Sequence, residues 1–149
     1  MSTITRFAEG EELTGRRRVA TERRIHWYGS GFMTANAGEP RVVQTNIHTD
    51  DEFAQNQGLP AAIADGMMSA NYISSLLVDA FGADFVRDGY LRTKFIKPVY
   101  VDEVLTPKAK ITSASSDGST TVYELDVWCE DVEGVKRTTG AARVTVPGQ

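Results

Sequence analysis

The second half of the chain alternates apolar and polar positions with a period of two. From residue 121 to residue 129, every second side chain is Thr, Tyr, Leu, Val or Cys, and Glu124 and Asp126 stand between them. This period predicts a half-buried β-strand. Similar patterns predict strands over residues 90–101, 104–113 and 135–146, with hairpin turns at 116–118 and 130–134. Pro98 interrupts the first of them, which is typical of an edge strand or a bulge.

A different pattern covers residues 66–82. Apolar residues occur on every face of a helix drawn through this segment, and Asp79 is its only charged residue. A helix that is apolar all round is buried on most of its sides. Small residues at Gly66, Ser69 and Ala70 allow other backbone to come close to its first turns. The segment is therefore predicted to be one long buried helix.

Two shorter helices are predicted before it. Thr21 is placed to cap a helix that Gly29 and Gly31 would end. The inward side of that helix is expected to carry Ile25, Tyr28 and Trp27. Residues 34–47 are expected to form a loop, and Thr49 with Glu52 makes a capping box for a second helix, which stops at Gly58–Pro60. His48 thus stands directly before a helix.

Helices followed by antiparallel strands predict an α+β fold, with a helix laid against one face of a sheet. The 149 residues correspond to a single domain over residues 1–149. A composition of 41% hydrophobic and 24% charged residues is that of a folded globular protein. The formal net charge of −4 argues against broad binding to nucleic acid, which usually needs a basic excess.

The remaining composition narrows the expected function class. Cys129 is the only cysteine, so no disulfide forms within the chain, and the two histidines lie far apart in sequence, which argues against a zinc site or other metal centre. Residues 1–10 contain no apolar run typical of a signal peptide, and no stretch approaches the ~18 apolar residues of a membrane span. A cytoplasmic enzyme or small-molecule binder is the expectation.

Four short blocks of sequence point to a known family. They run Asn-Ile-His-Thr-Asp-Asp-Glu-Phe-Ala from residue 46, Ile-Ala-Asp-Gly-Met from residue 63, Lys-Phe-Ile-Lys-Pro-Val from residue 94 and Val-Asp-Glu-Val-Leu from residue 101. In order, they resemble the blocks Asn-Pro-Ile-His-x-Asp-x-x-x-Ala, Ile-Ala-His-Gly-Met, Arg-Phe-x-x-Pro-Val and Gly-Asp-x-Leu of MaoC-like dehydratases and (R)-specific enoyl-CoA hydratases. The resemblance implies a hot-dog fold, in which a curved antiparallel sheet wraps around one long helix. It also implies a dimer that acts on acyl thioesters of CoA or acyl carrier protein, with no cofactor beyond the thioester that belongs to the substrate.

The departures from that family pattern concern its catalytic residues. The hydratase motif runs Asp-x-Asn-Pro-x-His, and its Asp and His are the catalytic pair. His48 keeps the His place, but the Asp place falls on Val43, the Asn on Thr45 and the Pro on Asn46. In the neighbouring block, the His before the helix glycine is Asp65. The resemblance therefore implies that one carboxylate is lost and another gained nearby.

Dehydration of a 3-hydroxyacyl thioester needs a base for the proton beside the carbonyl, an acid for the departing hydroxyl and a donor for the enolate oxygen. Gly66, at the start of the buried helix, offers an unpaired backbone N–H; its alternative role is tight helix–sheet packing. His48 is the expected proton shuttle, although it would also serve to bond the loop backbone. Asp65 is expected to complete the acid/base pair, or only to cap the helix. By resemblance, carrier-protein dehydratases pair a loop histidine with an acid on the partner subunit's central helix.

Other residues are weaker candidates. Met67 and Tyr72 are assigned to substrate binding, with plain core packing as the alternative. Cations at Arg92, Lys94 and Lys97 are expected to meet CoA phosphates, or to serve as ordinary charges on an edge strand. Asn36 and Glu39 are possible substitutes for the missing carboxylate. The basic run over residues 15–24 is either a solvated face or a contact for an anionic ligand group.

The leading prediction is an acyl-thioester hydratase or dehydratase, a carbon–oxygen lyase with an altered catalytic pair. A hot-dog thioesterase is the first alternative, because a carboxylate beside a helix-start N–H also suits the attack of water on a thioester. A non-catalytic subunit that binds acyl thioesters is the second, because Val43 replaces the usual Asp. A homodimer or higher homo-oligomer is expected, because a single hot-dog unit leaves an edge strand and one end of its ligand tunnel open.

Overall fold

The computed structural model describes residues 7–34 and 45–148. A six-stranded antiparallel sheet has the order β1-β4-β5-β6-β3, and β2 also pairs with β4. Its three long strands are β4 (Val104–Ser116), β5 (Thr120–Glu130) and β6 (Lys136–Pro147). The shorter strands are β1 (Glu12–Thr14), β2 (Arg18–Val19) and β3 (Tyr90–Phe95).

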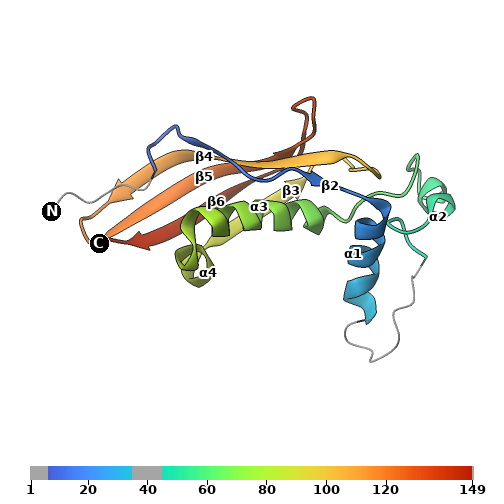
Figure 1. Cartoon of the computed structure of the whole chain (residues 1–149), viewed down its shortest axis with the longest axis horizontal. Helices are drawn as coiled ribbons and strands as arrows, with labels where there is room; N and C mark the ends of the chain where they lie inside the picture. The colour runs from blue at the N-terminus through green and yellow to red at the C-terminus, as the bar shows by residue number, and fades with distance from the viewer. Residues whose placement is uncertain (1–6, 35–44, 149) are drawn as a thin grey trace.

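Helices cover one face and one end of this sheet. They are α1 (Glu22–Thr34), α2 (Asp51–Asn56), α3 (Gly66–Phe81) and α4 (Ala83–Asp88). Figure 1 shows α3 lying along the sheet, with α1 and α2 gathered at the end where α3 begins. The predicted α+β class, with a long helix against one face of an antiparallel sheet, is confirmed.

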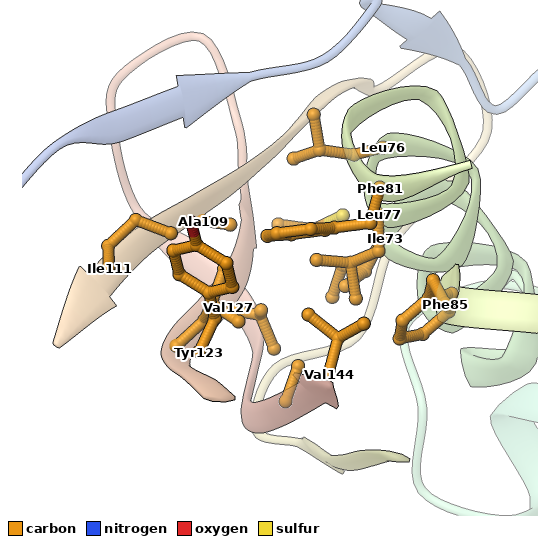
Figure 2. Close-up of a cluster of buried hydrophobic side chains, with 13 residues drawn as sticks. Ile73, Leu76, Leu77, Phe81, Phe85, Ala109, Ile111, Tyr123, Val127 and Val144 are labelled. Atoms are coloured by element: carbon orange, nitrogen blue, oxygen red, sulfur yellow. The ribbon is translucent and has the colours of Figure 1, made fainter. Parts of the chain in front are cut away.

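The main core lies between α3 and the inner face of the sheet. Ile73, Leu77 and Phe81 of α3 are almost completely buried and point toward side chains of β4, β5 and β6 (Figure 2). The alternation predicted for β5 is confirmed, because its inward positions 121, 123, 125, 127 and 129 are all buried. This apolar layer holds α3 in place and so sets where its first residue lies.

Several predicted boundaries were wrong. The strand expected over residues 90–101 ends at Phe95, because the N–H groups of Ile96 and Lys97 both turn to the Arg137 carbonyl and Pro98 has no N–H to offer a strand partner. The first helix runs past its two glycines to Thr34. The signals for β1, β2 and α4 were missed, since these elements are short and depend on contacts with β4, α3 and β6.

Two capping and packing details also differ from expectation. Asp50, not Thr49, is the N-cap of α2, and its Oδ1 accepts the Phe53 N–H at 2.7 Å. Thr49 instead accepts the Asn46 N–H at 3.1 Å, which closes the loop before the helix. Trp27 was expected to face inward but is 55% exposed.

No helix among the described residues is long and apolar enough to span a bilayer.

The core predicts a difference between two adjacent residues of α3. Leu77 is fully buried, so Leu77→Ala leaves a cavity and is expected to lower the free energy of unfolding by about 2–5 kcal/mol. Val78 is 37% exposed, so Val78→Ala should cost less than about 1 kcal/mol. Urea unfolding of both variants at one pH measures the difference. Equal losses would contradict the burial assigned to α3.

Candidate active site

The segment that leads into α3 is held on both sides by backbone hydrogen bonds. The Ile63 N–H donates to the Ile47 carbonyl at 3.0 Å, and the Ala64 N–H donates to the Val99 carbonyl at 2.8 Å. Ile63 also forms an isolated antiparallel bridge with Tyr100. The start of α3 is therefore fixed between the loop before α2 and the segment after β3.

His48 is positioned by the same segment. Its Nδ1 lies 2.8 Å from the Ile63 carbonyl oxygen, and its own backbone N–H donates to Asn46 Oδ1 at 2.8 Å. A carbonyl oxygen only accepts hydrogen bonds, so Nδ1 must carry a proton. In the neutral ring, Nε2 is then the free acceptor. It faces Asp65, with Nε2 3.9 Å from Oδ2.

Asp65 uses its two carboxylate oxygens differently. Oδ1 accepts the Met67 N–H at 2.8 Å, which makes Asp65 the N-cap of α3. Oδ2 is the atom that faces His48. The side chains of His48 and Asp65 are 20% and 31% exposed, so solvent or a ligand can reach the space between them. Capping and an interaction with His48 thus occur together.

Gly66 is the first residue of α3, and its backbone lies against Phe95. A Cβ at this position would stand 2.6 Å from the Phe95 ring, so only glycine fits without displacing that ring. The carboxylate and the carbonyl of Asp65 accept the N–H groups of Met67 and Met68. No acceptor for the Gly66 N–H lies among the residues the structure describes. The packing role proposed for Gly66 is real, and its N–H remains available to a ligand.

A buried pair of hydroxyls ties the first turn of α3 to β6. Ser69 Oγ donates to the Gly66 carbonyl at 2.8 Å and lies 2.6 Å from Thr138 Oγ1. Since the Ser69 proton is used on Gly66, the Thr138 hydroxyl donates to Ser69 Oγ. Both side chains are almost fully buried. The sequence did not predict this contact, because nothing in the spacing of residues 69 and 138 links them.

These groups surround one cavity of about 360 Å³. His48, Asp65 and Gly66 line it together with Ser69 and Thr138. Its apolar wall comes from the residue before α1, the segment between α2 and α3, the first turns of α3, the end of β3 with the segment after it, and β4: Ala20, Leu59, Ile63, Ala64, Met68, Tyr72, Phe95, Ile96, Pro98, Val99 and Leu105. Such a small, mostly apolar space with a few convergent polar groups is typical of a site for part of a small molecule.

Arg137 holds the wall formed by residues 96–103. Its guanidinium donates to the Pro98 carbonyl at 3.0 Å, to Glu103 Oε1 at 2.9 Å and to Asp131 Oδ2. The backbone N–H groups of Val135 and Glu133, together with Arg137, keep the pKa of Asp131 below its usual range. The network joins the β5–β6 turn to the segment that presents Val99 to Ala64.

Of the other residues predicted for substrate or CoA binding, only two line the cavity. Tyr72 and Lys97 line the cavity, whereas Met67 is 47% exposed and is not part of its lining. Arg92 and Lys94 line a separate shallow hollow with Trp128 and Lys136. The three cations assigned to CoA phosphates therefore do not form one group. Asn36, Glu39 and Val43 lie outside the described residues.

Cys129 has no chemical role that this geometry supports. Burial raises the pKa of its thiol to about 12, and its Sγ donates to the Ser69 carbonyl at 3.5 Å. A thiol that stays protonated is a poor nucleophile. Within residues 7–34 and 45–148, no three His, Cys, Asp or Glu side chains are grouped to hold a metal ion.

Comparison with solved structures gives the fold. The R-hydratase PhaJ1 from Pseudomonas aeruginosa matches with a TM-score of 0.69 at 16% identity, over 96% of this chain and 84% of that chain. A MaoC-like dehydratase from Rhodospirillum rubrum matches with a TM-score of 0.72 at 15% identity, over 100% and 99% of the two chains. The HadBC (3R-hydroxyacyl-ACP dehydratase) complex from Mycobacterium tuberculosis matches with a TM-score of 0.64 at 15% identity, over 92% and 96%. The expected hot-dog fold is confirmed.

The family follows from the sequence itself. The model of the MaoC like domain matches residues 45–132, more than half of the chain, and this range contains His48, Asp65 and Gly66. The chain belongs to the MaoC-like domain family, as the four blocks predicted. No curated protein matches it by sequence.

The hydrogen bond from His48 predicts its tautomer in solution. Neutral His48 is expected to carry its proton on Nδ1, because the Ile63 carbonyl 2.8 Å away accepts it. Side-chain ¹⁵N NMR above the histidine titration measures this directly, and a His26→Gln variant leaves His48 as the only ring to assign. A neutral ring protonated on Nε2 would contradict the arrangement.

Proposed function

We propose that this protein hydrates 2-enoyl thioesters, or dehydrates 3-hydroxyacyl thioesters, with His48 and Asp65 as its acid/base pair. The observation that carries the proposal is the placement of His48 Nε2 3.9 Å from Asp65 Oδ2, beside the Gly66 N–H and inside a mostly apolar cavity. Family membership and the fold shared with R-hydratases support the same reaction class.

The pair would work by sharing one proton. In hydration, the Asp65 carboxylate takes a proton from water as its oxygen bonds to C3, and the His48 imidazolium gives its Nε2 proton to C2. Asp65 is then protonated and His48 neutral, and transfer of the proton from Oδ2 to Nε2 restores the start. Dehydration runs the same steps backward. In both directions Nδ1–H stays on the Ile63 carbonyl, so the ring keeps its orientation.

The start of α3 would stabilise the intermediate between the two transfers. Negative charge develops on the thioester oxygen as the water oxygen bonds to C3 in hydration, or as C2 loses its proton in dehydration. The Gly66 N–H lies at the positive end of the helix dipole and has no acceptor among the described residues, so it is suited to bind that oxygen. The absence of a side chain at Gly66 lets the Phe95 ring, which also lines the cavity, pack directly against the start of α3.

The variant Asp65→Asn distinguishes the capping role of Asp65 from its proposed role in proton transfer. Asp65→Asn keeps an oxygen for the Met67 N–H and should leave the melting temperature nearly unchanged. It removes the ionisable group, so kcat is expected to fall roughly 10²–10⁴-fold. The measurement follows enoyl absorbance with crotonyl-CoA and 3-hydroxybutyryl-CoA, alongside His48→Gln, which should lose activity to a similar degree. Asp50→Asn is the matched control, because Asp50 caps α2 in the same way outside the cavity.

The outcomes of this assay separate the alternatives. Full turnover in Asp65→Asn would reduce Asp65 to a cap and remove the proposed pair. Release of free thiol would indicate a thioesterase. Inactivity of the wild-type protein toward all these thioesters, with binding retained, would favour a subunit without catalysis.

We also infer that two copies associate through the β3 side of the sheet. β3 ends the strand order, and Tyr90, Phe95 and Ile96 on or next to it are each more than half exposed. An open strand edge with exposed apolar side chains favours pairing with another chain. The HadBC structure, a complex of related fold, supports this inference.

Association is expected at micromolar concentration, and sedimentation velocity measures it. Tyr90→Lys combined with Ile96→Lys should shift the protein toward the monomer, because like charges would then meet across the edge. Val132→Lys, at a 71% exposed position on the β5–β6 turn, is the control. A wild-type monomer would contradict the inference.

A further inference from the structure

A second hollow adjoins the catalytic cavity. It has a volume of about 490 Å³ and lies between α1 and the first turns of α3. Met68 and Tyr72 line both spaces, so these two side chains form the partition between them. A ligand beside Asp65 therefore reaches the second hollow only where it passes these two side chains.

The charges around the second hollow are all positive. Arg18 and Arg24 line it, and no Asp or Glu does. The Arg18 guanidinium carbon lies 6.0 Å from the centre of the Tyr72 ring, and Arg24 Nη1 donates to the Val19 carbonyl at 2.9 Å. Among the described residues, neither guanidinium forms an ion pair. Two arginines held toward one hollow without a carboxylate make a site suited to an anion.

Neutral polar groups and an aromatic wall complete this hollow. Asn71 and Ser75 line it from α3, and Asn71 Nδ2 donates to the Tyr28 hydroxyl at 2.7 Å. Trp27 and Tyr28 line it from α1. The hollow therefore offers apolar surface for carbon atoms and donors for a charged end group.

Electrostatic effects connect the hollow to the catalytic pair. Burial raises the pKa of Tyr28, and the negative charge of Asp65 raises it further. Burial also raises the pKa of Tyr72, while Arg24 and Arg18 oppose that rise. The charge of Asp65 thus affects the pKa of Tyr28, and the charges of the two arginines affect the pKa of Tyr72.

Helix geometry gives the distance that a ligand would have to span. Tyr72 follows Asp65 by seven residues, which corresponds to about 10 Å along α3. An extended acyl chain of about ten carbons, with its thioester at Gly66, covers that length. A phosphopantetheine arm separates its phosphate from the thioester sulfur by several more bonds, so the acyl end is the better match for the arginines.

We propose that Arg18 and Arg24 form an anion subsite that selects thioesters whose acyl chain ends in a carboxylate. The inference rests on the proposed function for its turnover assay, because the acyl chain is oriented by the reaction at Asp65 and His48. Substrates of this class are monothioesters of unsaturated or hydroxylated dicarboxylic acids of medium length. Under this proposal the basic run over residues 15–24 contacts an anionic ligand group, which is one of the two interpretations given for it above.

The test compares acyl ends at fixed length and without phosphate. Hydration is measured for N-acetylcysteamine thioesters of dec-2-enoic acid and of dec-2-enedioic acid, the latter with a free terminal carboxylate. The wild-type protein should prefer the carboxylate substrate by about 10- to 100-fold in kcat/KM. Arg18→Gln with Arg24→Gln should abolish that preference and leave the methyl-ended substrate within a few-fold. Arg23→Gln is the control, because Arg23 neighbours Arg24 on α1 but does not line this hollow.

Two further measurements show whether the anion subsite or the proposed function is wrong. The same variants are assayed with the CoA thioesters; a loss confined to CoA substrates, regardless of acyl end, would assign the arginines to phosphate and overturn the proposal. Equal losses for both acyl ends would overturn it as well. Calorimetric binding of saturated ketone analogues, with CH₂ in place of the thioester sulfur, needs no turnover. A carboxylate preference in binding that depends on both arginines, without any hydration, would support the subsite while the proposed function fails.

Discussion

The arrangement of the site depends on a single peptide group, the one that joins Ile63 to Ala64. Its N–H donates to the Val99 carbonyl and its carbonyl oxygen accepts from His48 Nδ1, so one peptide group fixes both the start of α3 and the imidazole. This peptide group could not pair in this way if β3 continued in the sheet past Phe95. The break at Pro98, held by the Arg137 guanidinium, is what turns Val99 toward Ala64.

Asp65 both caps α3 and presents a carboxylate oxygen to His48. A carboxylate has two oxygens, and only one is needed for the Met67 N–H. The other remains directed at His48 in the same chain. The resemblance gave a precedent with the acid on the partner subunit, whereas here both side chains come from one protomer. Asp65 thus places a carboxylate beside His48 in a sequence that has Val43 at the family's Asp place.

Positively charged side chains lie on two sides of the cavity. Lys97 lies in the lining on the side of the segment after β3, and Arg18 with Arg24 lies beyond Tyr72 on the side of α1. Arg92 and Lys94, which seemed from sequence to belong with Lys97, line a separate hollow with Lys136 and Trp128. Strand alternation explains the division, because Lys97 follows the end of β3 and no longer obeys its two-residue period.

Local patterns in the sequence determined the long elements and pointed to the candidate site residues. The period of two in β5 and the apolar run of α3 define which faces are buried, and the blocks around His48 and Asp65 define the family. Short elements such as β1, β2 and α4 carry too few residues to show a period of their own. The tautomer of His48, the pairing of Ser69 with Thr138 and the meeting of α1 with α3 were decided only by tertiary structure. Each of them joins groups far apart in the chain, and hydrogen-bond partners at such separations are chosen by packing of the core rather than by any neighbour in sequence.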